Sequence, residues 1–107
     1  MEPLLVLTNL PDAASAETLA YALIDSRAAA CVNVLQPCRS IYRWQGRLET
    51  AEEVPLLIKT SVENYPLVEQ IVRDRHPYDV PELIALPITQ GLPAYLAWLA
   101  TETERHE

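Results

Sequence analysis

The chain has 107 residues, half of them hydrophobic and about a fifth charged, so we expect residues 1–107 to form a single domain with one modest core. Its formal net charge is −7, and no basic cluster interrupts the acidic balance, which argues against a nucleic-acid partner. No apolar run is long enough to cross a bilayer, and the first residues lack the pattern of a signal peptide. We therefore expect no membrane partner and a cytoplasmic location.

The N-terminal part predicts a strand followed by a helix. Residues 3–8 are an apolar run bounded by turn residues, as in a buried strand. Asp12 or Ser15 can cap the helix that follows, and Glu17 would lie in its first turn. The helix should pack on a sheet through apolar residues at helical spacing, namely Ala16, Leu19, Ala20, Leu23 and Ile24.

Residues 31–60 predict one long β-hairpin. Its two arms, 31–44 and 54–60, are rich in β-forming residues and flank Gln45-Gly46, where glycine supplies the positive φ of a tight turn. If residues 31–44 are extended throughout, they span roughly 46 Å at about 3.3 Å per residue, whereas a compact domain of this size is only on the order of 35 Å across. The tip should therefore project, with Pro37 marking a bulge or an edge.

A projecting two-stranded ribbon is unstable in water by itself, and its edges invite aggregation unless they are covered. The simplest cover is another copy of the same chain, closed by symmetry. With a two-residue turn, Trp44 lies opposite Arg47, Tyr42 lies opposite Glu49, and the same face continues through Glu53, Leu57 and Lys59.

Two cysteines, Cys31 and Cys38, fall in the first arm of the hairpin. They are an odd number of positions apart, so in a regular strand they point to opposite faces and cannot form a disulfide. We expect both to act as small buried hydrophobes.

The second half predicts a helix, a short strand and a final helix. Ser61 or Asn64 can cap the helix, Pro66 fits its first turn, and Pro77 ends it. Its buried stripe comprises Leu67, Val68, Ile71 and Val72, and the final helix, after Gly91, presents Leu92, Tyr95, Leu96 and Leu99. With strand 83–86 between them, the order becomes βαββαβ plus a C-terminal helix. This is the split β-α-β, or ferredoxin-like, plan of an α+β protein with an extended central hairpin.

This fold plan hosts many unrelated activities, so function has to be inferred from individual side chains and not from the fold. His76 either caps the end of the second helix or acts as a metal ligand, with Glu82, across the stiff Pro77–Pro81 connector, as its partner. Lys59 is the sole lysine, and an ion pair with Glu53 is favoured over a ligand-binding role.

Tyr42 and Trp44 are expected to be interface aromatics, with stacking on a small molecule as the alternative. Residues 8–15 contain neither arginine nor glycine, which argues against a phosphate site in the first β-α loop. No Gly-rich loop, Ser/His/Asp set or Cys-x-x-Cys occurs, so we expect no enzymatic activity.

Five segments in order resemble the CutA family of divalent-cation tolerance proteins. They are Ala29-Ala30-Cys31-Val32-Asn33, Ser40-Ile41-Tyr42-Arg43-Trp44-Gln45-Gly46, Ile58-Lys59-Thr60, His76-Pro77-Tyr78-x-x-Pro81-Glu82, and Gly91 followed by Tyr95-Leu96-x-Trp98. The resemblance implies a ferredoxin-like subunit, a homotrimer built by the long hairpins, and a role in tolerance to copper and other divalent metals. It also implies an intersubunit pocket, with His76 and Glu82 as metal ligands and Tyr42, Trp44, Glu53, Lys59 and Tyr78 in its lining.

Two positions depart from some family members. Thr8 stands where they carry a cysteine, and Arg75 stands where they carry a second histidine. Loss of a thiolate and an imidazole weakens a soft metal site, so we expect weak binding of Cu²⁺ or another divalent cation. The alternative is a signalling or scaffold trimer, like the trimeric nitrogen-signalling (PII) proteins, in which Lys59, Tyr42 and Trp44 hold a small anionic metabolite.

Overall fold

The computed structural model describes residues 1–105 and follows the predicted order of elements. In chain order these are β1 (Pro3–Leu10), α1 (Ala13–Asp25), β2 (Cys31–Val34), β3 (Cys38–Trp44), β4 (Arg47–Ser61), α2 (Tyr65–Arg75), β5 (Ile84–Pro87) and α3 (Pro93–Glu102). The main sheet has the order β2-β4-β1-β5, every neighbouring pair is antiparallel, and β3 pairs with β4 outside this path. The fold is therefore ferredoxin-like α+β, as predicted.

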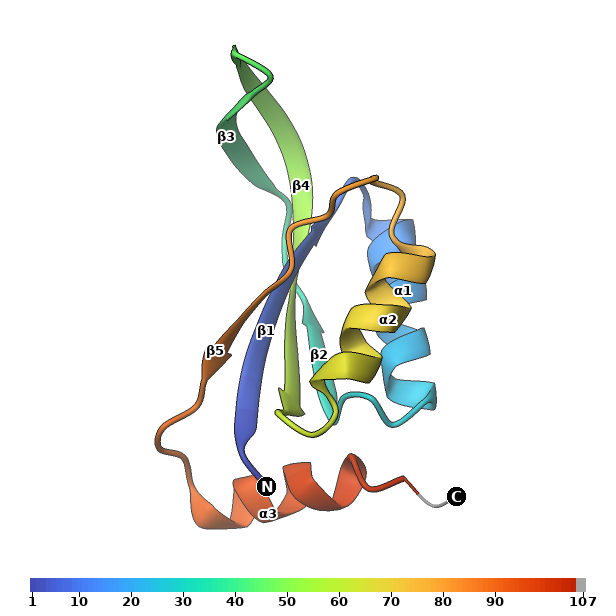
Figure 1. The fold of residues 1–107 in the computed structure, drawn as a ribbon, viewed down its shortest axis with the longest axis vertical. Coiled ribbons are helices and arrows are strands. Elements are labelled where there is room, and N and C mark those ends of the chain that lie inside the picture. Colours follow the sequence, from blue (N-terminus) through green and yellow to red (C-terminus); the bar gives the residue numbers. More distant parts are fainter. Residues whose placement is uncertain (106–107) are drawn as a thin grey trace.

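The two faces of the sheet have different surroundings. Helices α1 and α2 lie side by side against one face, which we call the helix face (Figure 1). Alternate residues of β1 and β4 point into this layer, so Val6 and Ile58 are fully buried against the stripes of α1 and α2. The other face, which we call the open face, has no helix layer, and Ile84 and Leu86 on it are 52% and 45% exposed.

Local signals set most of the helix boundaries. Asp12 caps α1 by accepting a 2.8 Å hydrogen bond from the backbone N–H of Ser15, which lowers the pKa of the Asp12 carboxyl. Glu17 is the fifth residue of α1, so its predicted place in the first turn is wrong. α2 ends at Arg75, because Pro77 pushes His76 into an extended conformation with ψ 136°. In residues 1–105 we find no helix with the length and apolarity needed to span a membrane.

The β3–β4 hairpin projects beyond the rest of the chain, and we call residues 38–53 the arm (Figure 1). The longest axis of the molecule is 44 Å, against 28 and 22 Å for the other two. Gln45 and Gly46 form the tip turn with φ of 51° and 78°, and Trp44 pairs with Arg47 as predicted. The arm leaves Ile41 and Leu48 65% and 70% exposed.

Residues 31–44 do not form the one continuous strand that was predicted for this side of the hairpin. They form two strands, β2 and β3, separated at residues 35–37. Val34 pairs with Leu56 and Cys38 pairs with Glu53, so three residues on this side oppose two on β4. The extra residue is a β-bulge, and Pro37, which has no N–H to donate, lies within it.

This bulge overturns the predicted orientation of the two cysteines. Cys31 pairs with Lys59 and Cys38 pairs with Glu53, and these partners are six residues apart on β4, so both cysteines point to the same face. About 20 Å of strand separates them, so both thiols are free. Both are partly exposed rather than buried.

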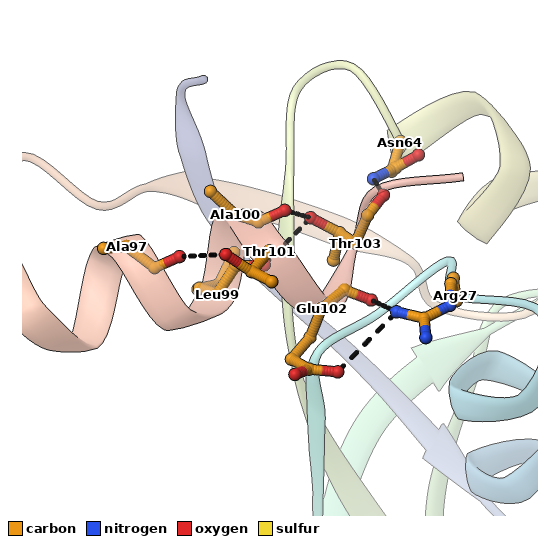
Figure 2. Close-up of polar contacts among 8 residues, drawn as sticks. All are labelled: Arg27, Asn64, Ala97, Leu99, Ala100, Thr101, Glu102 and Thr103. Carbon is orange, nitrogen blue, oxygen red and sulfur yellow. Dashed lines mark hydrogen bonds and ion pairs between the residues drawn. The ribbon is translucent and has the colours of Figure 1, made fainter. Parts of the chain in front are cut away.

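Side chains from two loops hold the C-terminal end of α3 (Figure 2). The Nδ2 group of Asn64 donates to the Thr103 carbonyl at 2.9 Å, and Nη1 of Arg27 donates to the Glu102 carbonyl at 3.2 Å. Both carbonyls lie at the end of the helix, where intrahelical donors run out. Asn64 is the N-cap residue of α2, as predicted, but its side chain makes no capping hydrogen bond and binds α3 instead.

Candidate functional site

The candidate site lies where the arm leaves the sheet, beside the loop of residues 76–82. Three side-chain hydrogen bonds hold this loop: His76 Nε2 to the Asn9 carbonyl at 2.6 Å, Thr8 Oγ1 to the Glu82 carbonyl at 2.6 Å, and Tyr78 Oη to Glu53 Oε2 at 3.1 Å. The loop is thus fixed to β1 at both ends and to β4 in its middle.

The imidazole of His76 serves the backbone through both of its nitrogens. Nε2 donates to the Asn9 carbonyl, while Nδ1 accepts from the Tyr78 N–H at 3.2 Å. β5 pairs only with residues 4–7 of β1, so it does not reach the Asn9 carbonyl. That carbonyl accepts its hydrogen bond from His76 instead. His76 is 8% exposed, it forms the C-cap of α2, and its ring lies 4.8 Å from that of Tyr78.

Glu82, the predicted partner of His76 at a metal, has an exposed side chain. Within residues 1–105 the structure holds no group of three or more His, Cys, Asp or Glu side chains placed to bind a metal ion. A divalent cation held by residues 1–105 of one chain would therefore need further ligands.

The carboxylate of Glu53 is buried at the base of the arm, with 8% of the residue exposed. The Tyr78 hydroxyl donates to it, and partial burial together with this carboxylate raises the pKa of Tyr78 to about 12. The predicted ion pair between Glu53 and Lys59 does not form. The two residues share a face, as predicted, but six residues of β4 place them about 20 Å apart.

Lys59 lies at the centre of the open face, between Leu5 of β1 and Cys31 of β2. It is partly exposed, and it is in neither of the two ion pairs that residues 1–105 form. Its ammonium is thus available to a ligand.

Tyr42 and Trp44 continue the face that carries Glu53, and they are 43% and 53% exposed. Four of the predicted pocket residues thus share one face of β3 and β4, and Tyr78 reaches Glu53 from the neighbouring loop. Cavities of about 610 Å³ and 370 Å³ lie elsewhere, between α1 and α2 and beside α3, and none of the five predicted pocket residues lines them.

Sequence reasoning missed Thr8 and Asn9 as anchors of the loop. Thr8 is fully buried, and its hydroxyl holds the Glu82 carbonyl. One signal was present, because a single hydroxyl within an apolar strand needs a buried partner. The partner itself could not be read, since it is a backbone group 74 residues away.

Comparisons with known proteins agree in one family. The family model described as CutA1 divalent ion tolerance protein matches residues 4–102. The divalent-cation tolerance protein CutA of Thermus thermophilus is 45% identical over 98 residues, which cover 92% of this chain and 95% of that protein. Among solved structures, CutA from Xylella fastidiosa has a TM-score of 0.94 at 40% identity, covering 97% of this chain and 100% of that one. CutA1 from Oryza sativa has a TM-score of 0.95 at 36% identity, covering 99% and 97%.

Proposed function

The chain belongs to the CutA1 divalent ion tolerance protein family, and we propose that it acts as a non-enzymatic homotrimer that binds a divalent cation weakly between subunits. The observation that carries this proposal is the arm, which exposes Ile41 and Leu48 to water in a single chain. Such a ribbon requires cover, and sister subunits supply it by symmetry. A cytoplasmic location stays a prediction from the sequence.

The ligands available for a cation explain why binding should be weak. The Glu82 carboxylate is exposed and free to coordinate, whereas Nδ1 of His76 must first release the Tyr78 N–H. Cys38, at the base of the arm, has its thiol 3.9 Å from the Ser40 hydroxyl and no second thiol beside it. A site with one carboxylate and one occupied imidazole is poor in the soft ligands that copper favours.

Calorimetric titration with CuCl₂ tests the site. We expect weak binding that is reduced in Glu82→Gln and in His76→Ala but retained in Asp79→Asn, a matched change to a neighbouring carboxylate of the same loop. Unchanged binding in both Glu82→Gln and His76→Ala would show that copper is held elsewhere.

A second candidate function is recognition of a small anionic metabolite by the same trimer. The observation that favours it is the Lys59 ammonium, partly exposed on the open face without an ion-pair partner in residues 1–105. Aromatic side chains on the same face of the arm, Tyr42 and Trp44, offer stacking surfaces. A thermal-shift screen of nucleotides and dicarboxylates should then give a hit that disappears in Lys59→Met. Hits that survive this substitution count against the pocket.

A further inference from the structure

The buried carboxylate of Glu53 lacks a compensating positive charge within its own chain. Its one hydrogen-bond donor is the neutral hydroxyl of Tyr78, and it takes part in neither ion pair found in residues 1–105. A buried charge is costly unless a counter-charge accompanies it. The loop that holds Tyr78 adds two further acidic residues, Asp79 and Glu82, and the charge of Asp12 also acts on Tyr78.

A route to this carboxylate remains open. The second oxygen of this carboxylate, Glu53 Oε1, has no hydrogen-bond partner. Within residues 1–105 every fully buried side-chain oxygen or nitrogen does have one, so Oε1 is not fully buried and can be reached from the surface. A donor that arrives from outside the chain can therefore complete the carboxylate.

The arm carries positive as well as negative charge. Residues 38–53 contain three of the eight lysines and arginines of the chain, Arg39, Arg43 and Arg47, together with Glu49, Glu52 and Glu53. Arg47 is exposed and lies directly opposite Trp44, on the face that also carries Tyr42 and Glu53. Arg43 pairs with Leu48 and points to the other face. Of the two tip arginines, Arg47 is thus the one beside the exposed aromatics.

We propose that the Glu53 carboxylate at the base of one arm receives the guanidinium of Arg47 of the partner subunit. The pair cannot form within one chain, because about 20 Å of β4 separates Arg47 from Glu53 and a side chain spans far less. A contact between the tip of one arm and the base of the next is heterologous, because it joins two different surfaces of neighbouring subunits. Such contacts close into a ring of three when each subunit is rotated by one third of a turn from the one before it. This inference rests on the proposed homotrimer and adds the residue that each subunit lends to its neighbour's site.

A double-mutant cycle followed by sedimentation over a dilution series tests the pair. Arg47→Gln leaves Glu53 buried without a counter-charge, so the concentration at which half of the trimer has dissociated should rise by at least about tenfold. Glu53→Gln, which keeps the volume and the hydrogen bond to Tyr78, should give a smaller rise. The double variant should dissociate no more readily than Arg47→Gln, because the neutral amide that replaces the Glu53 carboxylate needs no cation.

Arg43→Gln is the matched control, since it removes the same charge from the other face of the same arm. It should change the dissociation midpoint by less than about threefold. An equal effect of both arginine variants, or additive effects in the cycle, would overturn the pairing. Dissociation of the native trimer by EDTA would also overturn it, because a metal ion would then supply the counter-charge. A native chain that sediments as a monomer would instead refute the proposed function itself.

Discussion

The two halves of β4 differ in what lies against them. In the body of the molecule, Leu56 and Ile58 are fully buried beneath α1 and α2, whereas Leu48, in the arm, is 70% exposed. Both halves pair with neighbouring strands in regular register. The difference teaches that hydrogen-bonded pairing alone does not bury a strand, because burial needs a second layer. The body makes that layer from its own helices, and the arm depends on another molecule.

The largest expected effect is a core substitution in the body half of β4. Leu56→Ala should lower the free energy of unfolding by about 2–5 kcal/mol, because it removes fully buried methyl groups and leaves a cavity beneath the helices. Urea denaturation followed by circular dichroism measures this. A loss below about 1 kcal/mol would mean that the core collapses around the gap.

A polar substitution in the body ranks next. Thr60 is fully buried, and its hydroxyl donates to the Ala28 carbonyl at 2.6 Å. Thr60→Val keeps the shape but leaves that carbonyl unpaired, which should cost about 1–3 kcal/mol in the same urea experiment. Thr50→Val, at an exposed site of the arm on the same strand, is the matched control and should be close to neutral.

A leucine substitution in the arm should weaken association between subunits rather than lower the stability of the body. Leu48→Ala, made to match Leu56→Ala, should change the unfolding free energy of the body by less than about 0.5 kcal/mol. It should instead weaken association, so that the melting temperature falls more steeply on dilution than that of the native chain. Equal melting temperatures across a wide dilution series, in both proteins, would contradict the idea that the arm is covered by other subunits.

The smallest effect concerns pH at the junction of arm and body. The pKa of Tyr78 is raised to about 12 from its ordinary value of 10.0. The folded state therefore holds this proton more tightly than the unfolded state, so the stabilisation is complete below pH 10 and is lost as the pH rises toward 12. Absorbance titrations of the native chain and of Tyr78→Phe should differ by one phenol, which ionises near pH 12 in the native chain. Glu53→Gln should move that ionisation to lower pH, because a negative neighbour is removed.

Local patterns were sufficient to predict the framework of the fold. The helix-ending Pro77 and the turn at Gln45-Gly46 each act within a few residues, and both are observed. The predicted apolar stripe of α1 is observed for Ala16, Leu19, Ala20 and Leu23, whereas Ile24, the last residue predicted for it, is exposed. The projecting arm followed from length alone, since no compact domain of this size can contain so long a hairpin.

The errors at the candidate site share a cause, which is that the deciding group is distant in sequence. Glu53 was assigned to Lys59 on its own strand, but its partner is Tyr78, which reaches it from a loop 25 residues away. The ring nitrogens of His76 could not be assigned, because the Asn9 carbonyl is unpaired only where β5 stops short of the end of β1. Periodicity reports which face a side chain occupies and says nothing about which segment arrives there.

The bulge at residues 35–37 lies where the arm leaves the body, and a bulge bends and twists the strand that contains it. Three residues there oppose two on β4, so removing one of them, for example Gln36, would leave two opposite two and keep Cys38 opposite Glu53. Tyr42 and Trp44 would stay on the face that carries Glu53, but the strand would run through the junction without the bend. The length of this short connection therefore sets the direction in which the arm leaves the body, and we expect it to tolerate substitutions better than insertions or deletions.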